Sequence, residues 1–187
     1  MAVTSIWPIK GRIDQVIRYA QNPEKTAESG RAALHTIDGV MEYAADEMKT
    51  EQRSFVTCLN CRESTAAQDF MTTKQLWKKT SGRVCYHGYQ SFKAGEVTAE
   101  TAHEIGVKLA RGLWGSRFEV MVATHCNTGQ YHNHFVINSV SFMDGHKFYN
   151  SPADYAKMRE VSDRLCREYS LSVVKQPEGK SRSYGEW

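Results

Sequence analysis

The sequence predicts an α+β fold, with a central, mainly antiparallel sheet of about five strands and helices packed on it. Segments that alternate between apolar and polar residues recur among segments with a helical period. Two of the strand-like segments are separated only by a short polar turn, which is typical of a hairpin. A chain of 187 residues, 41% of them hydrophobic, is long enough for one domain with a sizeable core.

The first two elements are expected at the N-terminus. Residues 2–9 alternate and are rich in β-forming side chains, and Pro8 indicates a sheet edge or the end of a strand. Apolar residues then recur at helical spacing from Arg12 to Ala20. That helix must stop at residues 22–23, because a proline disfavours helical backbone in the residue before it.

The middle of the chain begins with a helix expected over about 38–48 and a short strand expected over 54–59. Ser64 can cap a helix that reaches about Thr80 and is ended by Gly82. The apolar face of that helix should bury Ala67, Phe70, Met71 and Trp77.

The next elements carry the strongest local signals. A strand is expected over 84–92, and Thr98 then caps a helix whose apolar residues recur at i, i+3, i+4, i+7 and i+11. A strand over 118–125 is the natural hairpin partner of a strand over 132–140.

The last elements are also marked by turn and cap signals. Residues 144–145 are an Asp-Gly turn, and residues 151–154 combine a cap, a proline at the first helical position and a carboxylate in the first turn. A last short strand is expected over 171–175. We expect one domain over 1–175, followed by a polar tail, 176–187, that leads to a further C-terminal region.

Composition limits the location and the partners. No apolar run reaches membrane-spanning length and the N-terminus lacks the features of a signal peptide, so a cytoplasmic location without a membrane partner is expected. The net charge of +3 permits a polyanionic partner. One basic group surrounds the first helix: Lys10, Arg12, Arg18, Lys25 and Arg31. A second group reads equally well as a solvated helix face: Lys74, Lys78, Lys79 and Arg83.

The five cysteines do not form a metal-binding pattern. Cys58 and Cys61 make a C-x-x-C, but a structural zinc site needs a second pair at suitable spacing. The other three cysteines are scattered and resemble small core residues.

Three histidines are the most informative feature of the chain. His132 and His134 point to the same face of an extended strand, and His125 can reach them if the chain turns back between the two strands. Any single histidine is more often an ordinary core or surface residue. Three of seven histidines within ten residues favour a metal site with open coordination positions, suited to a phosphate oxygen. Asn127 is a candidate to orient a ligand, or alternatively a turn residue.

Cleavage of a phosphate that is bound to a metal needs a nucleophile, which is either water or a side-chain hydroxyl. Tyr19 stands at the end of the first helix, among basic residues and just before a proline. Taken alone, it reads better as a half-buried aromatic residue, and Tyr43 has the same local surroundings and is its rival.

These residues also match a known family. The stretch from Tyr19 to Thr26 resembles the tyrosine motif of conjugative and mobilisation relaxases of the MOBP class, and the stretch from Val122 to Asn138 resembles their three-histidine motif. Residues 90–96 and 145–148 also resemble signatures of this family. The resemblance covers residues 2 to about 184, in the order found in the N-terminal catalytic domain of these enzymes. They belong to the HUH endonuclease superfamily, named for histidine-hydrophobe-histidine.

Two residues depart from the family pattern. Asn133 stands where a hydrophobic residue is usual, but it should point to the opposite face of the sheet, so that metal ligation survives. Asn127 stands where Asp is common, which removes a carboxylate that would orient His125 and could change metal affinity or preference.

The resemblance implies a DNA relaxase that nicks one strand at an origin of transfer and so initiates conjugative transfer of a plasmid or integrative element. Tyr19 would attack the scissile phosphate, forming a 5′-phosphotyrosyl intermediate and freeing a 3′-hydroxyl. His125, His132 and His134 would hold a divalent metal. Mn or Mg is expected in use, and Zn, Ni and Co also suit imidazole ligands.

The implied partners are single-stranded DNA at an origin of transfer, accessory relaxosome proteins and a coupling protein. Candidate phosphate contacts are Arg12, Arg18, Lys25 and Arg31. Candidate base-stacking residues are Trp7, Tyr131 and Phe148, although core packing is the commoner role of aromatic residues.

Three rival functions remain at this point. A rolling-circle replication initiator shares the nicking chemistry, but its tyrosine typically follows the histidine pair. A water-using metal phosphodiesterase would form no covalent adduct. A DNA-binding module stabilised by metal would bind without cleavage.

Overall fold

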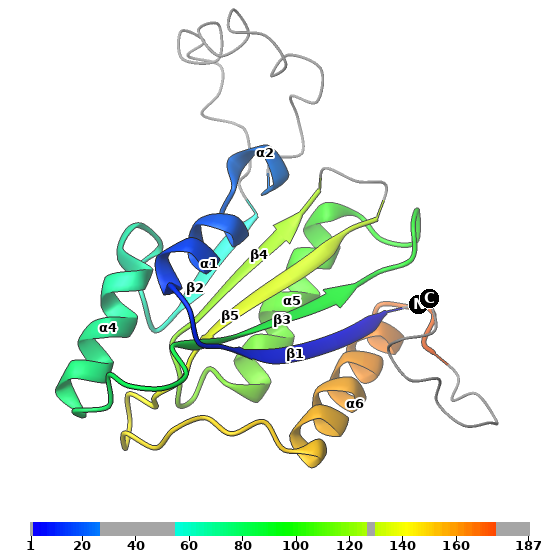
Figure 1. The fold of residues 1–187 in the computed structure, drawn as a ribbon. Helices are drawn as coiled ribbons and strands as arrows, with labels where there is room; N and C mark the ends of the chain where they lie inside the picture. The colour runs from blue at the N-terminus through cyan, green and yellow to red at the C-terminus, as the bar shows by residue number, and fades with distance from the viewer. Residues whose placement is uncertain (1, 27–54, 127–129, 175–187) are drawn as a thin grey trace, which may run out of the picture.

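The computed structural model describes residues 2–26, 55–126 and 130–174. Its centre is a five-stranded sheet with the strand order β1-β3-β5-β4-β2, in which every neighbouring pair is antiparallel (Figure 1). The strands are β1 (Val3–Ile9), β2 (Val56–Leu59), β3 (Cys85–Ser91), β4 (Val120–His125) and β5 (His132–Asn138). The predicted fold class is confirmed, and β1, which contains Pro8, is an edge strand as expected.

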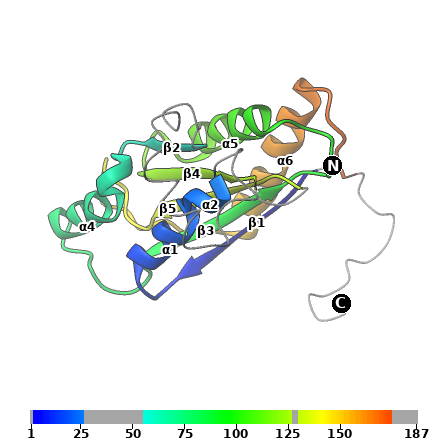
Figure 2. The ribbon, with the colours of Figure 1, turned by 90° about the horizontal axis from the view of Figure 1, so that it is seen from above.

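Helices cover both faces of this sheet. They are α1 (Ile13–Ala20), α2 (Pro23–Thr26), α4 (Ala66–Leu76), α5 (Ala99–Leu113) and α6 (Pro152–Glu168), with a short 3₁₀ turn, η2 (Glu63–Thr65), before α4. Seen from above, α5 and α6 lie on one side of the sheet and α1 and α2 on the other (Figure 2). Helix α4 packs beside α1. The sheet is therefore the middle layer of the described structure.

Alternation along the strands gives each face of the sheet its own core. Phe135 and Ile137 of β5 pack beneath α5 and α6, whereas Val136 between them packs beneath α1 and α4. The α5–α6 core also includes Ile6, Tyr86, Ile105, Leu109, Val122 and Met158. The α1–α4 core includes Ile13, Ile17, Phe70, Cys85 and Met121. Because both faces of the central strands are covered, their middle residues are fully buried.

Several local signals act as predicted. The Thr98 hydroxyl accepts the backbone N–H of Thr101 at 3.2 Å and caps α5. Ser151 and Asp154 form a reciprocal capping box at the start of α6. The hairpin of β4 and β5 pairs His125 with His132.

The region of α4 differs from the prediction at three points. Ser64 lies in η2 and does not cap α4, because the helix begins at Ala66 and Thr65 holds the cap position, without a capping hydrogen bond from its side chain. The helix ends at Leu76 and not near Gly82, because Lys78 takes a positive φ of 53°. Trp77, predicted to be buried, is 36% exposed because it lies beyond the last helical turn.

Two other expectations are corrected. The predicted strand over 171–175 is absent from its described part: the chain from 171 to 174 has no regular structure, and the N–H of Ser172 binds the Glu96 carboxylate. After α1 ends as predicted, Pro23 starts a further short helix, because proline suits the first helical position.

Some predictions lie outside the described residues. They concern the helix at 38–48, the tail at 176–187, Arg31, Tyr43 and Asn127. Cys85, Cys126 and Cys166 are buried, as predicted for core residues. Within the described ranges, every helix is too short or too polar to cross a membrane.

Candidate functional site

The three predicted histidines lie together at one end of the two central strands, on the α1 face of the sheet. His125 ends β4 and His132 begins β5, directly opposite in the register, and His134 follows on the same face. The ring centroids of His125 and His134 are 4.0 Å apart. The hairpin therefore brings the histidines together by strand pairing alone.

These histidines line one open cavity of about 570 Å³. The other lining residues come from β1, α1, α2 and β3, so that six elements, with β4 and β5, contribute to it. They are Val3, Tyr19, Lys25, Tyr89 and Ser91.

Tyr19 lies over the histidines. In α1 the buried residues are Ile13, Ile17 and Ala20, which leaves the Tyr19 side chain 48% exposed. The Tyr19 ring centroid is 5.5 Å from that of His125 and 5.8 Å from that of His134, both in edge-on contact. The structure thus brings together four of the residues singled out in the sequence.

A backbone hydrogen bond ties the tyrosine helix to the histidine strand. Nε2 of His125 lies 3.1 Å from the carbonyl oxygen of Ala20, the residue after Tyr19. A carbonyl oxygen only accepts, so Nε2 of His125 must carry the proton. In a neutral ring, Nδ1 of His125 is then the nitrogen with a free lone pair, which is the form that a metal ligand requires.

His87 is a fourth histidine of this site, and the sequence analysis missed it. Its Nε2 lies 3.0 Å from Nδ1 of His134, and the two rings stack with centroids 5.2 Å apart. On its other side, His87 packs against Trp7, at 4.8 Å between centroids. Alternation along β3 places His87 on the same face as Tyr89, but only the pairing of β3 with β5 brings it to His134.

Burial keeps the imidazoles of the site neutral. Burial lowers the pKa of His125 to about 4, with the Lys25 charge acting in the same direction and the Ala20 hydrogen bond opposing it. Burial, then the neighbouring His125 and His87, lowers the pKa of His134 still further. Burial also lowers the pKa of His132. Neutral imidazoles keep the lone pairs that a metal or a proton needs.

The positive charge of the site comes from Lys25. Its Nζ lies 4.0 Å from the centroid of the Tyr19 ring, within cation–π distance. Of the other predicted phosphate contacts, Arg12 is exposed but paired with Asp14 at 2.6 Å, and Arg18 is exposed on α1.

The fit of a divalent metal can be tested against these side chains. Three neutral imidazoles in one cavity are suitable donors for such an ion. Within the described ranges, however, no three His, Cys, Asp or Glu side chains are arranged to hold a metal. His125 and His134 each use one ring nitrogen in a hydrogen bond to protein. The donor chemistry fits, and ligation by the three histidines stays a prediction.

The predicted stacking residues fall into two groups. Trp7 is 37% exposed beside His87 and remains available to a base. Phe148 packs against Tyr86 and Phe118, so core packing occupies it. Tyr131 is half-buried and packs against the core.

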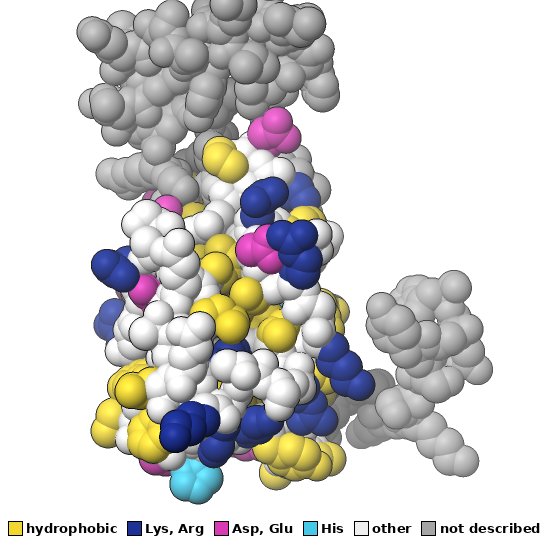
Figure 3. Space-filling model, turned by 60° about the vertical axis from the view of Figure 1, so that its left-hand side comes forward, with side chains coloured by type: hydrophobic (Ala, Val, Ile, Leu, Met, Phe, Trp, Pro, Cys, Tyr) yellow, Lys and Arg dark blue, Asp and Glu magenta, His cyan; other side chains and the backbone are white. Residues whose placement is uncertain are grey.

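The surface beside α4, away from the histidines, is basic. Figure 3, which brings the α4 side forward, shows more Lys and Arg than Asp and Glu on that face. Of the second predicted basic group, Lys74 is not solvated: it is 1% exposed and binds the Ser139 hydroxyl.

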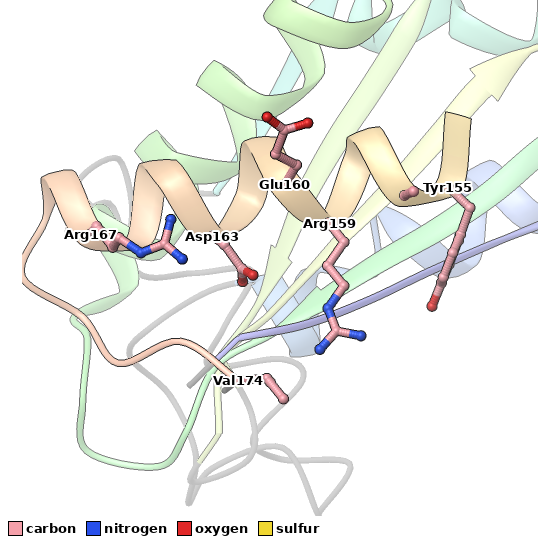
Figure 4. A pocket seen from close by; sticks show the side chains of 7 residues that line it. Tyr155, Arg159, Glu160, Asp163, Arg167 and Val174 are labelled. Carbon is pink, nitrogen blue, oxygen red and sulfur yellow. The ribbon is translucent and has the colours of Figure 1, made fainter. Parts of the chain in front are cut away.

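A separate hollow of about 400 Å³ lies between α6 and Val174 (Figure 4). It mixes Arg159 and Arg167 with acidic side chains, a lining that favours no particular ligand.

Comparison with known proteins identifies the family of the chain. The relaxase family described as MobA/VirD2-like, nuclease domain, matches residues 43–171, which include the three histidines but not Tyr19. The protein rlx of Staphylococcus aureus is 37% identical over 127 residues, which cover 68% of this chain and 38% of rlx. The group II intron-interrupted relaxase LtrB of Lactococcus lactis is 25% identical over an alignment covering 90% of this chain and 33% of LtrB.

A solved structure shares the fold. It is described as the molecular basis of vancomycin resistance transfer in Staphylococcus aureus, and it aligns with a TM-score of 0.56 and 10% identity over 96% of this chain and 100% of that one. The chain spans about two fifths of the length of the rlx proteins that it matches. Since the family match covers more than half of the residues, the chain belongs to the MobA/VirD2-like relaxases and contains their nuclease domain.

Proposed function

We propose that this domain nicks one DNA strand at an origin of transfer, with Tyr19 as the nucleophile, and so initiates conjugative transfer. Membership of the relaxase family supports the reaction class. One observation supports the role of Tyr19: its ring lies within 6 Å of two imidazoles in the cavity that also holds Lys25. Tyr43, the rival nucleophile, lies outside the described residues.

The proposed step exchanges one phosphodiester bond for another. The Tyr19 oxygen forms a bond to the scissile phosphorus, and the bond from phosphorus to the 3′-oxygen of the preceding nucleotide breaks. The phenolic proton leaves to a base, for which His87 is a candidate, because its ring centroid lies 6.3 Å from that of Tyr19 and it is not one of the proposed metal ligands. The departing 3′-oxygen takes up a proton, so the products are a 5′-phosphotyrosine and a free 3′-hydroxyl.

The other residues of the cavity bind and orient the phosphate. Lys25 brings a positive charge to the place where the phosphate must enter, which favours the extra negative charge of the transition state. A divalent metal held by His125, His132 and His134 would polarise the phosphate, with Mn or Mg the expected ions and Zn, Ni or Co alternatives. Asn127 remains a predicted orienting residue.

Single-stranded DNA is the proposed substrate, and membership of the relaxase family supports it. Arg12, Arg18 and Arg31 are proposed to follow the DNA backbone, and Trp7 to stack on a base. Accessory relaxosome proteins and a coupling protein are proposed as partners of the whole protein. The cytoplasm, where plasmid DNA resides, is the proposed location.

Nicking and covalent attachment can be measured together. The 187-residue chain is incubated with Mn²⁺ and labelled single-stranded oligonucleotides covering the origin of transfer of its own element. We expect a protein–DNA adduct on a denaturing gel, and mass spectrometry should find the 5′-phosphate on the Tyr19 peptide. Tyr19→Phe should abolish the adduct, whereas Tyr155→Phe, on α6 and away from the cavity, should not.

Other outcomes would select the rival functions. Attachment at Tyr43 would reassign the nucleophile within the same reaction. Cleavage without an adduct would favour a water-using phosphodiesterase, and binding without cleavage would favour a DNA-binding module. Nicking at a replication origin but not at an origin of transfer would favour a rolling-circle initiator.

A further inference from the structure

The row of side chains behind the histidines is polar and buried. Asn133 lies between His132 and His134 in β5, so it points through the sheet toward α5, as the sequence predicts. It is paired with Gln90 of β3 on one side and with Thr124 of β4 on the other. All three side chains are fully buried. A polar row in this position is unexpected, because the neighbouring residues on the same face form an apolar core.

Both the nitrogen and the oxygen of the Asn133 amide are hydrogen-bonded in this row. Its Nδ2 donates to the carbonyl oxygen of Ala102 at 2.7 Å and to Oε1 of Gln90 at 3.0 Å. Its Oδ1 accepts the hydroxyl of Thr124 at 2.6 Å. Because the Ala102 carbonyl oxygen only accepts, the orientation of the amide is fixed.

The directions of the remaining bonds follow from this orientation. Thr124 has one hydroxyl proton, which it gives to Asn133, so it must accept from Nδ1 of His103 at 2.8 Å. Nε2 of a neutral His103 then accepts from the Thr57 hydroxyl, at 2.8 Å. At the other end, Gln90 donates to the Ser162 hydroxyl at 2.7 Å. One unbroken chain of hydrogen bonds thus runs from β2 to α6.

This chain crosses the sheet between the two rows that carry the nicking site. The row on one side contains Ser91, His132 and His125, and the row on the other contains Tyr89, His134 and Ala123. A slip of β5 by one residue would move both histidines to the wrong face and would break every bond that Asn133 makes. The amide therefore specifies the same register that the imidazoles require.

Helix α5 is shaped to receive this amide. A Cβ at Gly106 would lie 2.4 Å from Nδ2 of Asn133, so only glycine lets the helix approach closely enough. The Ala102 carbonyl comes from the preceding turn of α5.

We propose that Asn133 is a positioning residue for the nicking site: its amide holds β3, β4 and β5 in register and so sets the spacing of His125, His132 and His134. This inference rests on the proposed function, in which those histidines bind a metal beside the scissile phosphate. If Asn133 had a purely structural role, its loss would lower the stability of the protein without affecting the histidines. If Asn133 positions the site, its loss should also change the histidine rings and metal binding.

The test compares two buried asparagines of the same strand. Asn133→Leu keeps the side-chain volume and removes all three hydrogen bonds. Asn138→Leu is the matched control, because Asn138 is equally buried and donates to Phe70 and Glu119 at the far end of β5. Each full-length variant is measured for unfolding midpoint, Mn²⁺ affinity, and kcat and KM on the oligonucleotide. Ring ¹H–¹⁵N correlation spectra of the metal-free histidines complete the measurements.

We expect Asn133→Leu to weaken Mn²⁺ binding and lower kcat by about 10-fold each, the lower end of the effect of losing groups that orient metal ligands. KM should stay close to that of the parent chain. The histidine ring signals should shift or broaden in the metal-free protein. Asn138→Leu should lower the unfolding midpoint but leave affinity, kcat and ring spectra unchanged.

A second pair of variants covers a failure of Asn133→Leu to fold. Thr124→Val keeps the shape and removes one link of the chain, and Thr124→Ser restores the hydroxyl. The proposal requires Thr124→Val to weaken Mn²⁺ binding and Thr124→Ser to recover it. If Asn133→Leu, or Thr124→Val in its place, loses only stability while the ring spectra and the Mn²⁺ affinity stay unchanged, Asn133 is a core residue without a positioning role. If the parent chain neither binds Mn²⁺ nor nicks DNA, the proposed function fails, and the ring spectra alone decide the role of Asn133.

Discussion

Replacing Gly106 by alanine tests how closely α5 approaches the sheet. The new Cβ would lie 2.4 Å from Nδ2 and 2.6 Å from Cγ of Asn133, well inside normal contact distance. Either the helix shifts, at an overpacking cost of about 1–3 kcal/mol, or the Asn133 amide turns away. In the second case it loses three hydrogen bonds of about 1 kcal/mol each. Alanine returns about 1 kcal/mol of helix propensity, so we expect a net loss of up to about 2 kcal/mol.

The measurement is the free energy of unfolding by chemical denaturation, and α5 itself supplies the control. Gly112 lies in the same helix, and a Cβ there would meet nothing within 4 Å. Gly112→Ala should therefore stabilise the protein by about 0.5–1 kcal/mol. Combining Gly106→Ala with Asn133→Ala should cost less than the sum of the two single losses, because the clash is absent from the double variant. A Gly106→Ala protein as stable as Gly112→Ala would refute the close approach.

Three further predictions concern other parts of the molecule. Burial lowers the pKa of Lys74 from 10.5 to about 8, so between these two pH values the unfolded chain holds more protons than the folded chain, and the contribution of Lys74 to stability rises with pH. Lys74→Met should therefore flatten the rise of the unfolding free energy with pH, measured by denaturation. An unchanged slope would contradict the lowered pKa of Lys74. Ser151→Ala should cost about 1 kcal/mol by removing the capping box with Asp154, whereas Ser151→Thr should cost much less, and equal losses would argue against the cap. Mn²⁺ at about 100 times its Kd should stabilise the parent chain by about 2.7 kcal/mol, and the same concentration should not stabilise the His134→Ala variant. Equal thermal shifts in the two proteins would show that His134 is not a metal ligand.

The strands and the histidine hairpin could be predicted because their signals are local. Alternation identified β1, and short strand-like segments, two of them joined as a hairpin, identified β3, β4 and β5. The period of two residues in a strand placed Asn133 on the face opposite His132 and His134. Since strand pairing sets the spacing of the hairpin residues, the two strands were enough to bring His125 to the other two histidines.

The errors arose where distant parts of the chain decide the outcome. The end of α4 depends on a positive φ at Lys78, and the presence of a lysine in the sequence does not predict that backbone conformation. The short run at 171–175 alternates like a strand, but in the described part its Ser172 N–H binds Glu96. His87 was missed for the same reason: its place beside His134 follows from the order of the strands, which no local pattern reveals.

The central position of β4 and β5 has a consequence for motion. Each of these strands is bonded to a neighbour on both sides, so releasing His132 or His134 requires opening the ladders to β3 and β4 at once, and His125 is held by its pairing with His132. Helix α1 is only eight residues long, and within the described part of the chain it is held mainly by side-chain packing and by the hydrogen bond from His125 to the Ala20 carbonyl. Amide exchange should therefore be slowest beneath the imidazoles and faster in α1. Under the proposed function, we therefore expect the tyrosine side of the site to move more readily than the histidine side.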